Sequence, residues 1–461
     1  MKILFAIHNL GYADHIAVSY LSAIAKQLGH STYFCTLTKE PFCSKDLLSE
    51  VVNIKPDVVA FSINILGFNE AIECNAKAKK LHKYISILGG PQATFAPETF
   101  AISGMDAYCV GEGEYAFKDF LTCIANNKSF EDIPNLITNK GANSVRPLLN
   151  LEELPAADRD LVLSNTILGT AVKKTFYTSR GCPFNCAYCC NDYYRKLYKG
   201  KGPAVRKFPV QTVINELQYV KANYKMEFVK FGDDCFTIKA DNWLLEFAEL
   251  YSHQIKIPFN CYLRIDTIEE SLLELLKKAG CFSVHLSIDS TSSRVREDIL
   301  HRQMRSSDFI DKLLLVNSYG INTWVNYMLA APTSTIQDDL DTIEVSRLGR
   351  VTYASYSTTV PMVQTSLYNY CLEHNLIDPS TYVGDMEGCS SRSVLNCFTS
   401  KEKDIRYNIY LLGAIIAKLP TPWYKMGILL IKKIPPNKLY IKLRQLFYQY
   451  YIERYIYKIR G

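Results

Sequence analysis

The sequence lacks any apolar run of the ~20 residues that a membrane-spanning helix needs. It also lacks low-complexity tracts and repeats of solenoid length, which excludes repeat architectures. Apolar residues make up 48% and charged residues 21% of the 461 residues, which excludes a disordered chain or a coiled coil. The first eight residues turn polar too soon for a signal peptide and are predicted to form a strand. We therefore expect a cytoplasmic protein of two to four domains.

Acidic residues are nearly missing from the last part of the chain. From Leu411 to Gly461 there are ten Lys and Arg residues and one acid, Glu453, so this segment carries a charge of +9. The whole chain carries +6, which leaves −3 for residues 1–410, and we expect no nucleic-acid partner. The segment is also rich in tyrosine. It is interpreted either as an interfacial helix, with the protein peripheral at the inner membrane face, or as a helix packed on its neighbouring domain.

Residues 1–126 alternate short apolar runs with amphipathic stretches at a repeat of roughly 25 residues. This pattern predicts a doubly wound, Rossmann-like α/β domain over residues 1–140, with a parallel sheet that binds ligands beyond the carboxyl ends of its strands. Glycine-containing turns follow three of these strands. They contain Gly11, then Gly89, Gly90, Pro91 and Thr94, and then Gly111, Glu112 and Gly113. The third group is no dinucleotide fingerprint, because it follows the fifth strand and the third glycine is missing.

The rest of the chain divides into three parts. Residues 141–172 contain Pro147 and Pro155 with weak periodicity and are predicted to be a linker. Residues 173–375 begin a second series of strands and helices, and six predicted strands indicate an incomplete (βα)6 barrel. Residues 376–461 are predicted to be helical over Ile405–Leu419 and Leu439–Ile459. Prolines 420, 422, 435 and 436 separate these two helices.

Three cysteines, Cys182, Cys186 and Cys189, lie in the loop after the first predicted barrel strand. A C-x3-C-x2-C loop can turn three thiolates toward one centre, and soft sulfur ligands suit zinc or an iron–sulfur cluster. A structural zinc site normally has a fourth ligand nearby. Cys190 is adjacent to Cys189, so the two side chains are not expected to reach the same metal, and no histidine follows until His253. The sequence therefore favours the iron–sulfur cluster over zinc. The other twelve cysteines are scattered, and Cys389 with Cys397 is weak support for an auxiliary cluster.

This motif resembles that of the radical S-adenosylmethionine (SAM) enzymes, including the aromatic residue, Tyr188, just before the last cysteine. The resemblance implies a 4Fe-4S cluster held by the three cysteines, with one iron open for SAM. Reductive cleavage of SAM to a 5′-deoxyadenosyl radical is then expected, with an electron donor such as flavodoxin or ferredoxin. The protein's share is to bind and orient these groups.

The resemblance extends to two later strand ends. Gly232, Asp233 and Asp234 stand where the family has a Gly-Gly-Glu-like motif near the SAM ammonium, and a helix cap is the alternative. Asp289 stands where the family places a carboxylate or hydroxyl near the SAM ribose or carboxylate, again with capping as the alternative. The stretch 329–333 matches the family's Gly-x-Pro-Gly turn without its glycines.

Residues 1–140 resemble the cobalamin-binding domain of class B radical SAM enzymes. The resemblance rests on the glycine turns at 89–94 and 111–114, which in that family flank the corrinoid. A domain that has lost its ligand is the alternative. Asp14 and His15 are adjacent, unlike the spaced Asp-x-His of domains that ligate cobalt, so we expect cobalamin without a histidine ligand. His8 and His15 are interpreted as polar residues at a strand end and a helix start.

Together these features predict a cobalamin-dependent radical SAM enzyme that methylates an unactivated carbon. A radical cyclase or rearrangement enzyme that acts on a hydrophobic substrate is the alternative within the enzyme class. A non-catalytic corrinoid sensor is the alternative outside it. The substrate is expected to be a small molecule, a lipid or a peptide.

Overall fold

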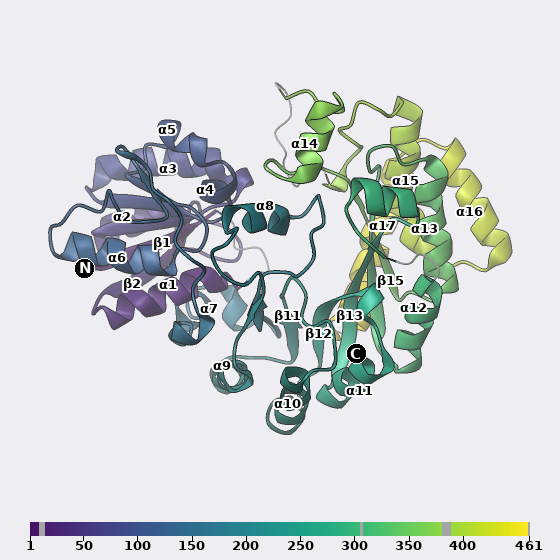
Figure 1. The fold of residues 1–461 in the computed structure, drawn as a ribbon, viewed down its shortest axis with the longest axis horizontal. Helices are drawn as coiled ribbons and strands as arrows, with labels where there is room; N and C mark the ends of the chain where they lie inside the picture. The colour runs from purple at the N-terminus through teal and green to yellow at the C-terminus, as the bar shows by residue number, and fades with distance from the viewer. Residues whose placement is uncertain (9–13, 305–307, 380–388, 460–461) are drawn as a thin grey trace. The chain divides into compact units, whose positions relative to one another are not determined.

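The computed structural model describes residues 1–8, 14–304, 308–379 and 389–459 (Figure 1). The chain packs into two compact units. Unit 1 contains residues 1–175 and 194–226, and unit 2 contains residues 176–193 and 227–461. No helix among the described residues is long and apolar enough to cross a membrane.

Unit 1 is built on a seven-stranded sheet of the order β2-β1-β3-β4-β5-β6-β7. Its first five strands are parallel, as the sequence predicts: β1 (Lys2–Ile7), β2 (Ser31–Thr36), β3 (Val58–Ser62), β4 (Ile85–Gly89) and β5 (Ala107–Cys109). These strands are mostly apolar and buried, because helices cover parallel sheets on both faces; the first half of the edge strand β2 is more exposed. Two short antiparallel strands extend the edge, β6 (Leu136–Thr138) and β7 (Gly141–Ala142).

The connecting helices of unit 1 are α1 (Ile16–Gln27), α2 (Leu47–Ile54), α3 (Phe68–Leu81), α4 (Pro91–Phe95), α5 (Phe100–Ser103), α6 (Glu114–Ala125), α7 (Asp160–Leu163) and α9 (Val210–Asn223). Three of them, α1, α3 and α9, fall on stretches that the sequence predicts to be helical, 17–28, 70–82 and 210–223. The eight-residue α2 was not predicted, since two turns give too short a periodic signal.

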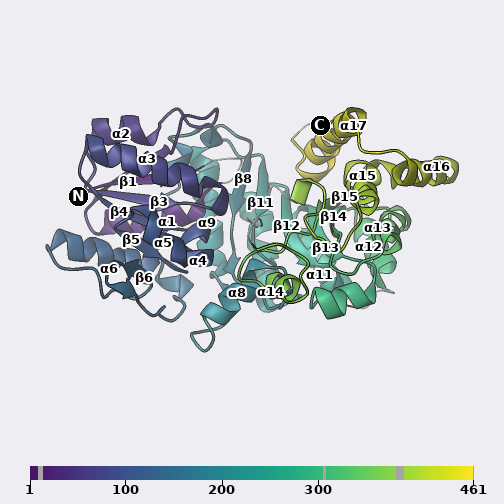
Figure 2. The same ribbon diagram turned by 90° about the horizontal axis from the view of Figure 1, so that it is seen from above.

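The second sheet is the predicted six-stranded sheet of an incomplete barrel, in the order β15-β14-β13-β12-β11-β8 (Figure 2). The strands run β8 (Lys173–Phe176), β11 (Phe228–Phe231), β12 (Phe259–Arg264), β13 (Cys281–Asp289), β14 (Asn322–Leu329) and β15 (Tyr353–Thr358). Strands β11 to β15 belong to unit 2, while residues 173–175 of β8 belong to unit 1. The strands β11 to β15 pair in parallel. Helices α10 (Asn242–Leu250), α11 (Glu270–Ala279), α12 (Phe309–Ser318), α13 (Ile336–Leu348) and α14 (Ser366–Glu373) follow these strands in turn.

The C-terminal region is helical, as predicted, but contains a third helix. The helices are α15 (Ser400–Ile416), α16 (Thr421–Lys433) and α17 (Lys438–Tyr451), followed by a short π-helical turn at Ile452–Ile456. The prediction that Pro420 and Pro422 only separate helices was wrong, because Pro422 lies in the first turn of α16. Proline is tolerated there since the first turn has no intrahelical partner for its missing N–H.

The end of the chain packs on the barrel sheet. Ile452, Ile456 and Tyr457 form a buried cluster with Phe228 of β11 and Tyr353 of β15. The hydroxyl of Ser283 donates a hydrogen bond to the Ile456 carbonyl at 2.6 Å. The interpretation of the tail as a helix packed on its neighbouring domain therefore holds for this last turn.

Candidate functional site

The three cysteines lie on one loop between β9 (Ser179–Arg180) and α8 (Cys190–Leu197). Cys186 is buried, and Cys182 and Cys189 are half-buried. The loop is fixed in its middle, where the Ala187 N–H donates to the Leu300 carbonyl and the Ala187 carbonyl accepts from the Leu367 N–H. In the part of the chain that the structure describes, no three His, Cys, Asp or Glu side chains are already grouped as metal ligands. The ligand role of the three thiols therefore stays a prediction from their spacing.

The donor chemistry of this loop fits an iron–sulfur cluster. Burial raises the pKa of Cys182 to about 11 and also raises the pKa of Cys186, so both are protonated thiols at neutral pH without metal. The Cys190 thiol donates to Cys189, which lowers the pKa of Cys189 and raises that of Cys190. Metal ligation deprotonates thiols, so cluster binding would release protons here.

A buried ionic group lies beside the cysteine loop. The Arg302 side chain pairs with Asp289 (Nε to Oδ2, 3.0 Å) and lies 3.5 Å from the Cys186 sulfur. The Tyr188 hydroxyl donates to Asp289 Oδ2 at 2.5 Å and accepts from Arg302 at 3.2 Å. Arg302 also donates to the Ser287 carbonyl at 2.7 Å. Asp289 ends β13 with a φ of +66°, where the pairing with β14 shifts register. Asp289 is the N-cap of none of the helices that the structure describes, so the alternative role weighed for it is wrong.

The carboxylates after β11 differ in environment. Asp233 is 2% exposed, and its Oδ1 accepts from the Thr178 N–H (2.8 Å), the Thr178 hydroxyl (3.0 Å) and the Ser179 hydroxyl (2.6 Å). Burial raises the pKa of Asp233 to about 6. Asp234 is exposed and accepts from the Asn191 amide at 3.0 Å. Asp233 thus fixes the entry to the cysteine loop, while Asp234 remains accessible.

The helix-cap alternative for Asp233 and Asp234 is wrong. Asp241 caps α10 instead and accepts from the Leu244 N–H. Gly232 is required by packing, because a Cβ there would lie 2.8 Å from the Tyr177 ring.

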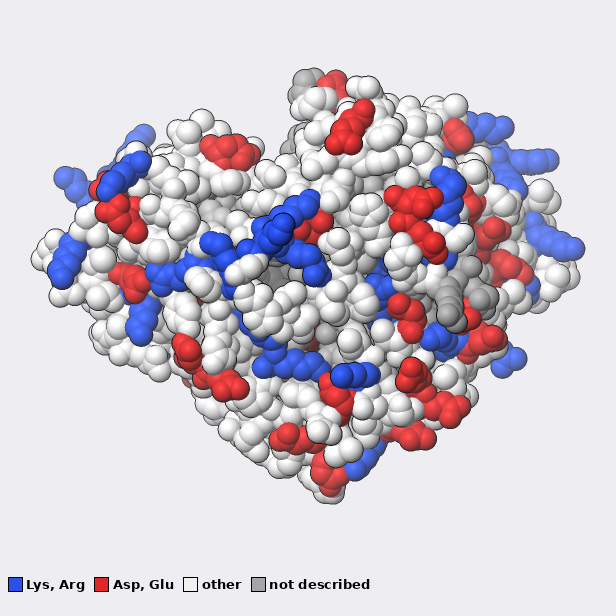
Figure 3. Space-filling view, in the orientation of Figure 1, with Lys and Arg blue, Asp and Glu red and all other residues white. Residues whose placement is uncertain are grey.

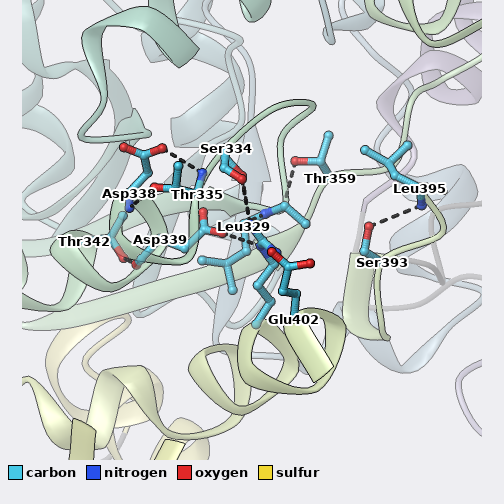
Figure 4. Close-up of polar contacts among 12 residues, drawn as sticks. Leu329, Ser334, Thr335, Asp338, Asp339, Thr342, Thr359, Ser393, Leu395 and Glu402 are labelled. Carbon is cyan, nitrogen blue, oxygen red and sulfur yellow. Dashed lines mark hydrogen bonds and ion pairs between the residues drawn. The ribbon is translucent and has the colours of Figure 1, made fainter. Parts of the chain in front are cut away.

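The turn after β14 keeps the backbone shape of a glycine turn without the glycines. Ala330 has a φ of +57° and Thr333 a φ of +63°. Figure 4 shows Asp339 beside this turn, where its carboxylate accepts from the Ala330 N–H at 3.3 Å. Arg406 of α15 donates to Asp339 at 2.6 Å and to the Ser334 carbonyl at 2.8 Å. The C-terminal helices thus hold this strand end in place.

Two further strand residues, Arg264 and His285, are held in packing contacts. Arg264 pairs with Asp266 at 2.7 Å and lies 3.7 Å over the ring of Phe184 in the cysteine loop. His285 stacks on Trp324 at 4.3 Å between ring centroids and also contacts the Tyr262 ring at 4.4 Å. Arg264 also donates to the Gln303 carbonyl at 2.9 Å. Asp266 and Gln303 are among the residues that line a pocket of about 490 Å³, with Glu297, Met304, Phe309 and Lys312.

In unit 1 the predicted glycine turns lie at the carboxyl ends of β4 and β5. Gly89 ends β4, and Gly90 has a φ of +87°, with its Cβ position 3.1 Å from the Ile63 carbonyl oxygen. Pro91 starts α4. The hydroxyl of Thr94 accepts from the Gly111 N–H at 3.0 Å and donates to the Gly90 carbonyl, which joins the two turns. Gly113 precedes α6.

The turn after β5 is packed by residues that sequence reasoning missed. Gly111 has a φ of +77°, and a Cβ there would meet the Tyr198 hydroxyl. Tyr198 accepts from the Glu112 N–H at 2.6 Å, and Arg206 pairs with the Glu112 carboxylate at 2.5 Å. The space that a side chain at position 111 would need is therefore filled by Tyr198 of the same unit, which fixes this turn.

The turn after β1 is only partly described, since Gly11 lies outside the described residues. Asp14 is buried against Arg159 at 3.0 Å and accepts from the Thr175 N–H, so it has a structural role. His15 precedes α1 with a φ of +41°, and His8 follows β1 and lies 3.3 Å from Glu70. Both histidines are polar residues at a strand end and a helix start, as predicted.

No motif marks Arg302, Tyr198 or Arg206, because each contacts its partner across about 90 residues or more. Only the fold brings such pairs together, and a single sequence carries no signal for them.

The comparisons with known proteins cover both halves of the chain. Residues 176–344 match the family model of the Radical SAM superfamily, and residues 5–121 match that of the B12 binding domain. An uncharacterized methyltransferase of Pyrococcus horikoshii is 24% identical over 78% of this chain and 79% of its own length. The hopanoid C-3 methylase of Methylococcus capsulatus is 24% identical over 69% of this chain and 61% of its own.

Among solved structures, the methyltransferase TsrM of Kitasatospora setae, with cobalamin and a 4Fe-4S cluster bound, has a similar fold. Its TM-score is 0.66 at 15% identity, over 81% of this chain and 78% of that one.

Proposed function

Because this chain belongs to the cobalamin-binding radical SAM methyltransferases, we propose that it methylates an unactivated carbon of a small-molecule substrate. The observation that carries the proposal is the pairing of a B12 binding domain with a radical SAM domain that contains the three-cysteine loop. When bound, the cluster, SAM and cobalamin supply the electron transfer, hydrogen abstraction and methyl group that the reaction needs.

Each candidate residue has a place in this proposal. Cys182, Cys186 and Cys189 would hold the cluster, and the buried charge of Arg302 beside Cys186 favours thiolate over thiol. Asp234 would be the accessible carboxylate for the SAM ammonium. Asp233 would position the cysteine loop through its hydrogen bond from the Ser179 hydroxyl. Asp289 and Tyr188 would line the SAM side of the cluster.

The residues of unit 1 would contact the corrinoid. Gly89, Gly90, Pro91, Thr94, Gly111, Glu112 and Gly113 form the joined turns at the strand ends, and Gly11 belongs to the same predicted set. Asp14 and His15 leave no spaced Asp-x-His arrangement, so cobalamin is expected to bind without histidine ligation. A flavodoxin or ferredoxin would supply the electron.

The assignment of the cluster predicts the behaviour of one variant. Cys186→Ala should abolish both the charge-transfer absorbance of the anaerobically reconstituted protein and 5′-deoxyadenosine formation with SAM and dithionite, because two thiolates cannot hold the cluster. Cys123→Ala, which removes a half-buried thiol of α6 outside the motif, is the matched control and should retain both signals. Normal absorbance in Cys186→Ala would show that the ligand set is wrong.

The mass of the reaction product distinguishes methyl transfer from the alternative reactions. Metabolites from cells with and without the gene, grown on methyl-deuterated methionine, should differ by one labelled methyl group. A product lighter by two hydrogens would mean cyclisation. Absence of 5′-deoxyadenosine despite a full cluster would favour the corrinoid sensor.

A further inference from the structure

Helices α16 and α17 each have an apolar stripe that the described residues leave exposed. On α16 the stripe contains Trp423, Met426 and Leu430, spaced i, i+3 and i+7, with Leu429 beside it. On α17 it contains Leu439, Leu443, Leu446 and Tyr450, spaced i, i+4, i+7 and i+11. Trp423, Leu439 and Leu446 are 58%, 62% and 59% exposed. Scattered exposed leucines are ordinary, but regular stripes on two successive helices mark an interaction surface.

These stripes are not the faces by which the helices pack on the protein. Gly427 and Ile431 of α16 are buried, and the Cβ position of Gly427 lies against Ile416 of α15. The Asn408 amide of α15 donates to the Ile431 carbonyl at 3.1 Å. On α17, Tyr440 is the buried residue. Each helix therefore has one apolar side packed and a second apolar side exposed.

The charge carried by the two helices has one sign, and the carboxylate that lines the groove beside Leu429 is that of Asp341 on α13, next to Lys425 and Lys432. Residues 421–452 contain Lys425, Lys432, Lys433, Lys438, Lys442 and Arg444 and no acidic residue. Figure 3 shows lysine and arginine side chains gathered at the edge of the molecule where Figure 1 places α16. An apolar stripe bordered by lysines and ringed by Trp and Tyr has the composition of a helix that lies in a membrane interface.

We propose that the exposed stripes of α16 and α17, two helices that both pack on α15, bind an anionic lipid bilayer; the two stripes are here called the α16–α17 face. Its lysines complement acidic headgroups, and its leucines and Trp423 insert at the level of the acyl boundary. A nucleic acid would match the lysines but not the leucines. A second copy of this chain would place lysines against lysines, which opposes self-association. The bilayer is the partner that satisfies both the charge and the apolar area.

The proposal is tested with the full-length protein and vesicles. Flotation with vesicles of phosphatidylglycerol and phosphatidylcholine in equal parts should recover the protein, with at least tenfold weaker binding to pure phosphatidylcholine. Raising the salt from 0.1 M to 1 M should weaken binding, because the screening length falls from about 10 Å to about 3 Å. Failure to bind the anionic vesicles at 0.1 M salt would overturn the proposal.

The fluorescence of Trp423 reports contact between the α16–α17 face and the bilayer directly. Trp423 is the exposed one of the three tryptophans, since Trp243 and Trp324 are half-buried. Anionic vesicles should shift its emission to shorter wavelength, and brominated lipid should quench it. Trp423→Phe should remove this response while flotation persists. An unchanged shift in Trp423→Phe would show that the signal comes from elsewhere and would count against the α16–α17 face.

Variants separate the two contributions. Leu439→Gln with Leu446→Gln should weaken vesicle binding at least tenfold, and Lys433→Gln with Lys438→Gln and Lys442→Gln should weaken it about fivefold for each lysine. The matched controls are Leu245→Gln, at a leucine 58% exposed on α10, and the triple change Lys239→Gln, Lys256→Gln and Lys277→Gln at exposed lysines, and these should bind as the parent does. Equal loss of vesicle binding in the controls would refute the proposal. It would also be refuted if the parent bound no vesicles and sedimented as a dimer that the leucine substitutions dissociate.

Discussion

At the scale of the residue, Asp233 couples the candidate site to pH. The carboxyl keeps its proton up to a pKa of about 6 in the folded protein, against 3.8 for the ordinary group, because burial penalises the charge. Its Oδ2 has no hydrogen-bond partner among the described residues, which fits a group that prefers to be neutral. The folded state therefore binds more protons than the unfolded state between these two values.

This predicts a fall in stability as pH rises from about 4 through about 6. The contribution of Asp233 is fully present below the unfolded pKa and is lost above the folded one, a change of about 3 kcal/mol. Asp233→Asn, which mimics the neutral carboxyl, should reduce that fall, measured as urea unfolding at pH 4.5 and pH 8. The exposed neighbour variant Asp234→Asn should keep the full fall. A slope in Asp233→Asn as steep as in the parent would show that burial does not perturb this carboxyl.

Arg302 is a positioning residue for the cysteine loop. Its guanidinium lies between Cys186 and Asp289, both buried. A positive charge beside a sulfur ligand favours the more negative, reduced state of a cluster. We expect Arg302→Met to shift the midpoint potential to more negative values and Arg302→Lys to keep it nearer the parent value, as followed by redox titration with EPR detection. Equal potentials in Arg302→Met and the parent would assign Arg302 a purely structural role.

The cysteine ligands could be predicted from the sequence and Arg302 could not, for one physical reason. Chemistry within an eight-residue loop is fixed by local spacing, so Cys182, Cys186 and Cys189 are visible as a pattern. Arg302 lies 116 residues from Cys186 along the chain, so only the folded structure brings the two side chains together. For Asp289 the resemblance gave the position, and the structure adds its partners.

At the scale of the element, helix α15 clamps the carboxyl end of β14. Arg406 and Asp339 are 1% and 2% exposed, and Arg406 also lies 3.9 Å over the Phe398 ring. Removing one partner of a buried pair leaves an uncompensated charge, so Arg406→Met should lower the free energy of unfolding by about 3–5 kcal/mol. Urea unfolding of this variant and of Arg406→Met with Asp339→Leu should show a smaller loss in the double variant.

The control for the α15 clamp is an exposed pair in the same region. Arg392 and Asp404 lie 2.6 Å apart, but their side chains are 47% and 30% exposed. Arg392→Met should cost less than about 1 kcal/mol, because solvent screens the pair. If the two arginine variants lost equal stability, the clamp would contribute no more than a surface contact.

Elements with a clear period were predictable, and those that depend on exceptions were not. The five parallel strands of unit 1, the six strands of the barrel sheet and helix α9 stand within a few residues of the runs that predict them, since parallel strands are short and mostly apolar. Helix α16 was missed because prolines usually end helices, whereas here Pro422 begins one. Strands β6 and β7 were missed because two or three residues carry no alternation.

At the scale of the whole molecule, the chain does not divide into units at single points along the sequence. Residues 194–226 pack with residues 1–175, although they follow the first barrel strand. The contacts of this packing include Arg206 with Glu112, Tyr198 with the Glu112 N–H, and Arg159 with Glu216 at 3.6 Å. If unit 1 unfolds cooperatively, its two segments should lose structure together.

Hydrogen exchange on the intact chain tests this grouping. Arg206→Met removes a paired charge whose partners are 11% and 17% exposed, so we expect it to weaken unit 1 by about 1.5–3 kcal/mol. Protection should fall about tenfold or more in peptides from both β5 and α9, while peptides from β13 and β14 keep theirs. Arg294→Met, an exposed arginine of unit 2, should change neither set. If α9 instead kept its protection with β13 and β14, residues 194–226 would unfold with the barrel. The domain boundary that the sequence predicts, between residues 140 and 173, would then describe the cooperative units better than the packing does.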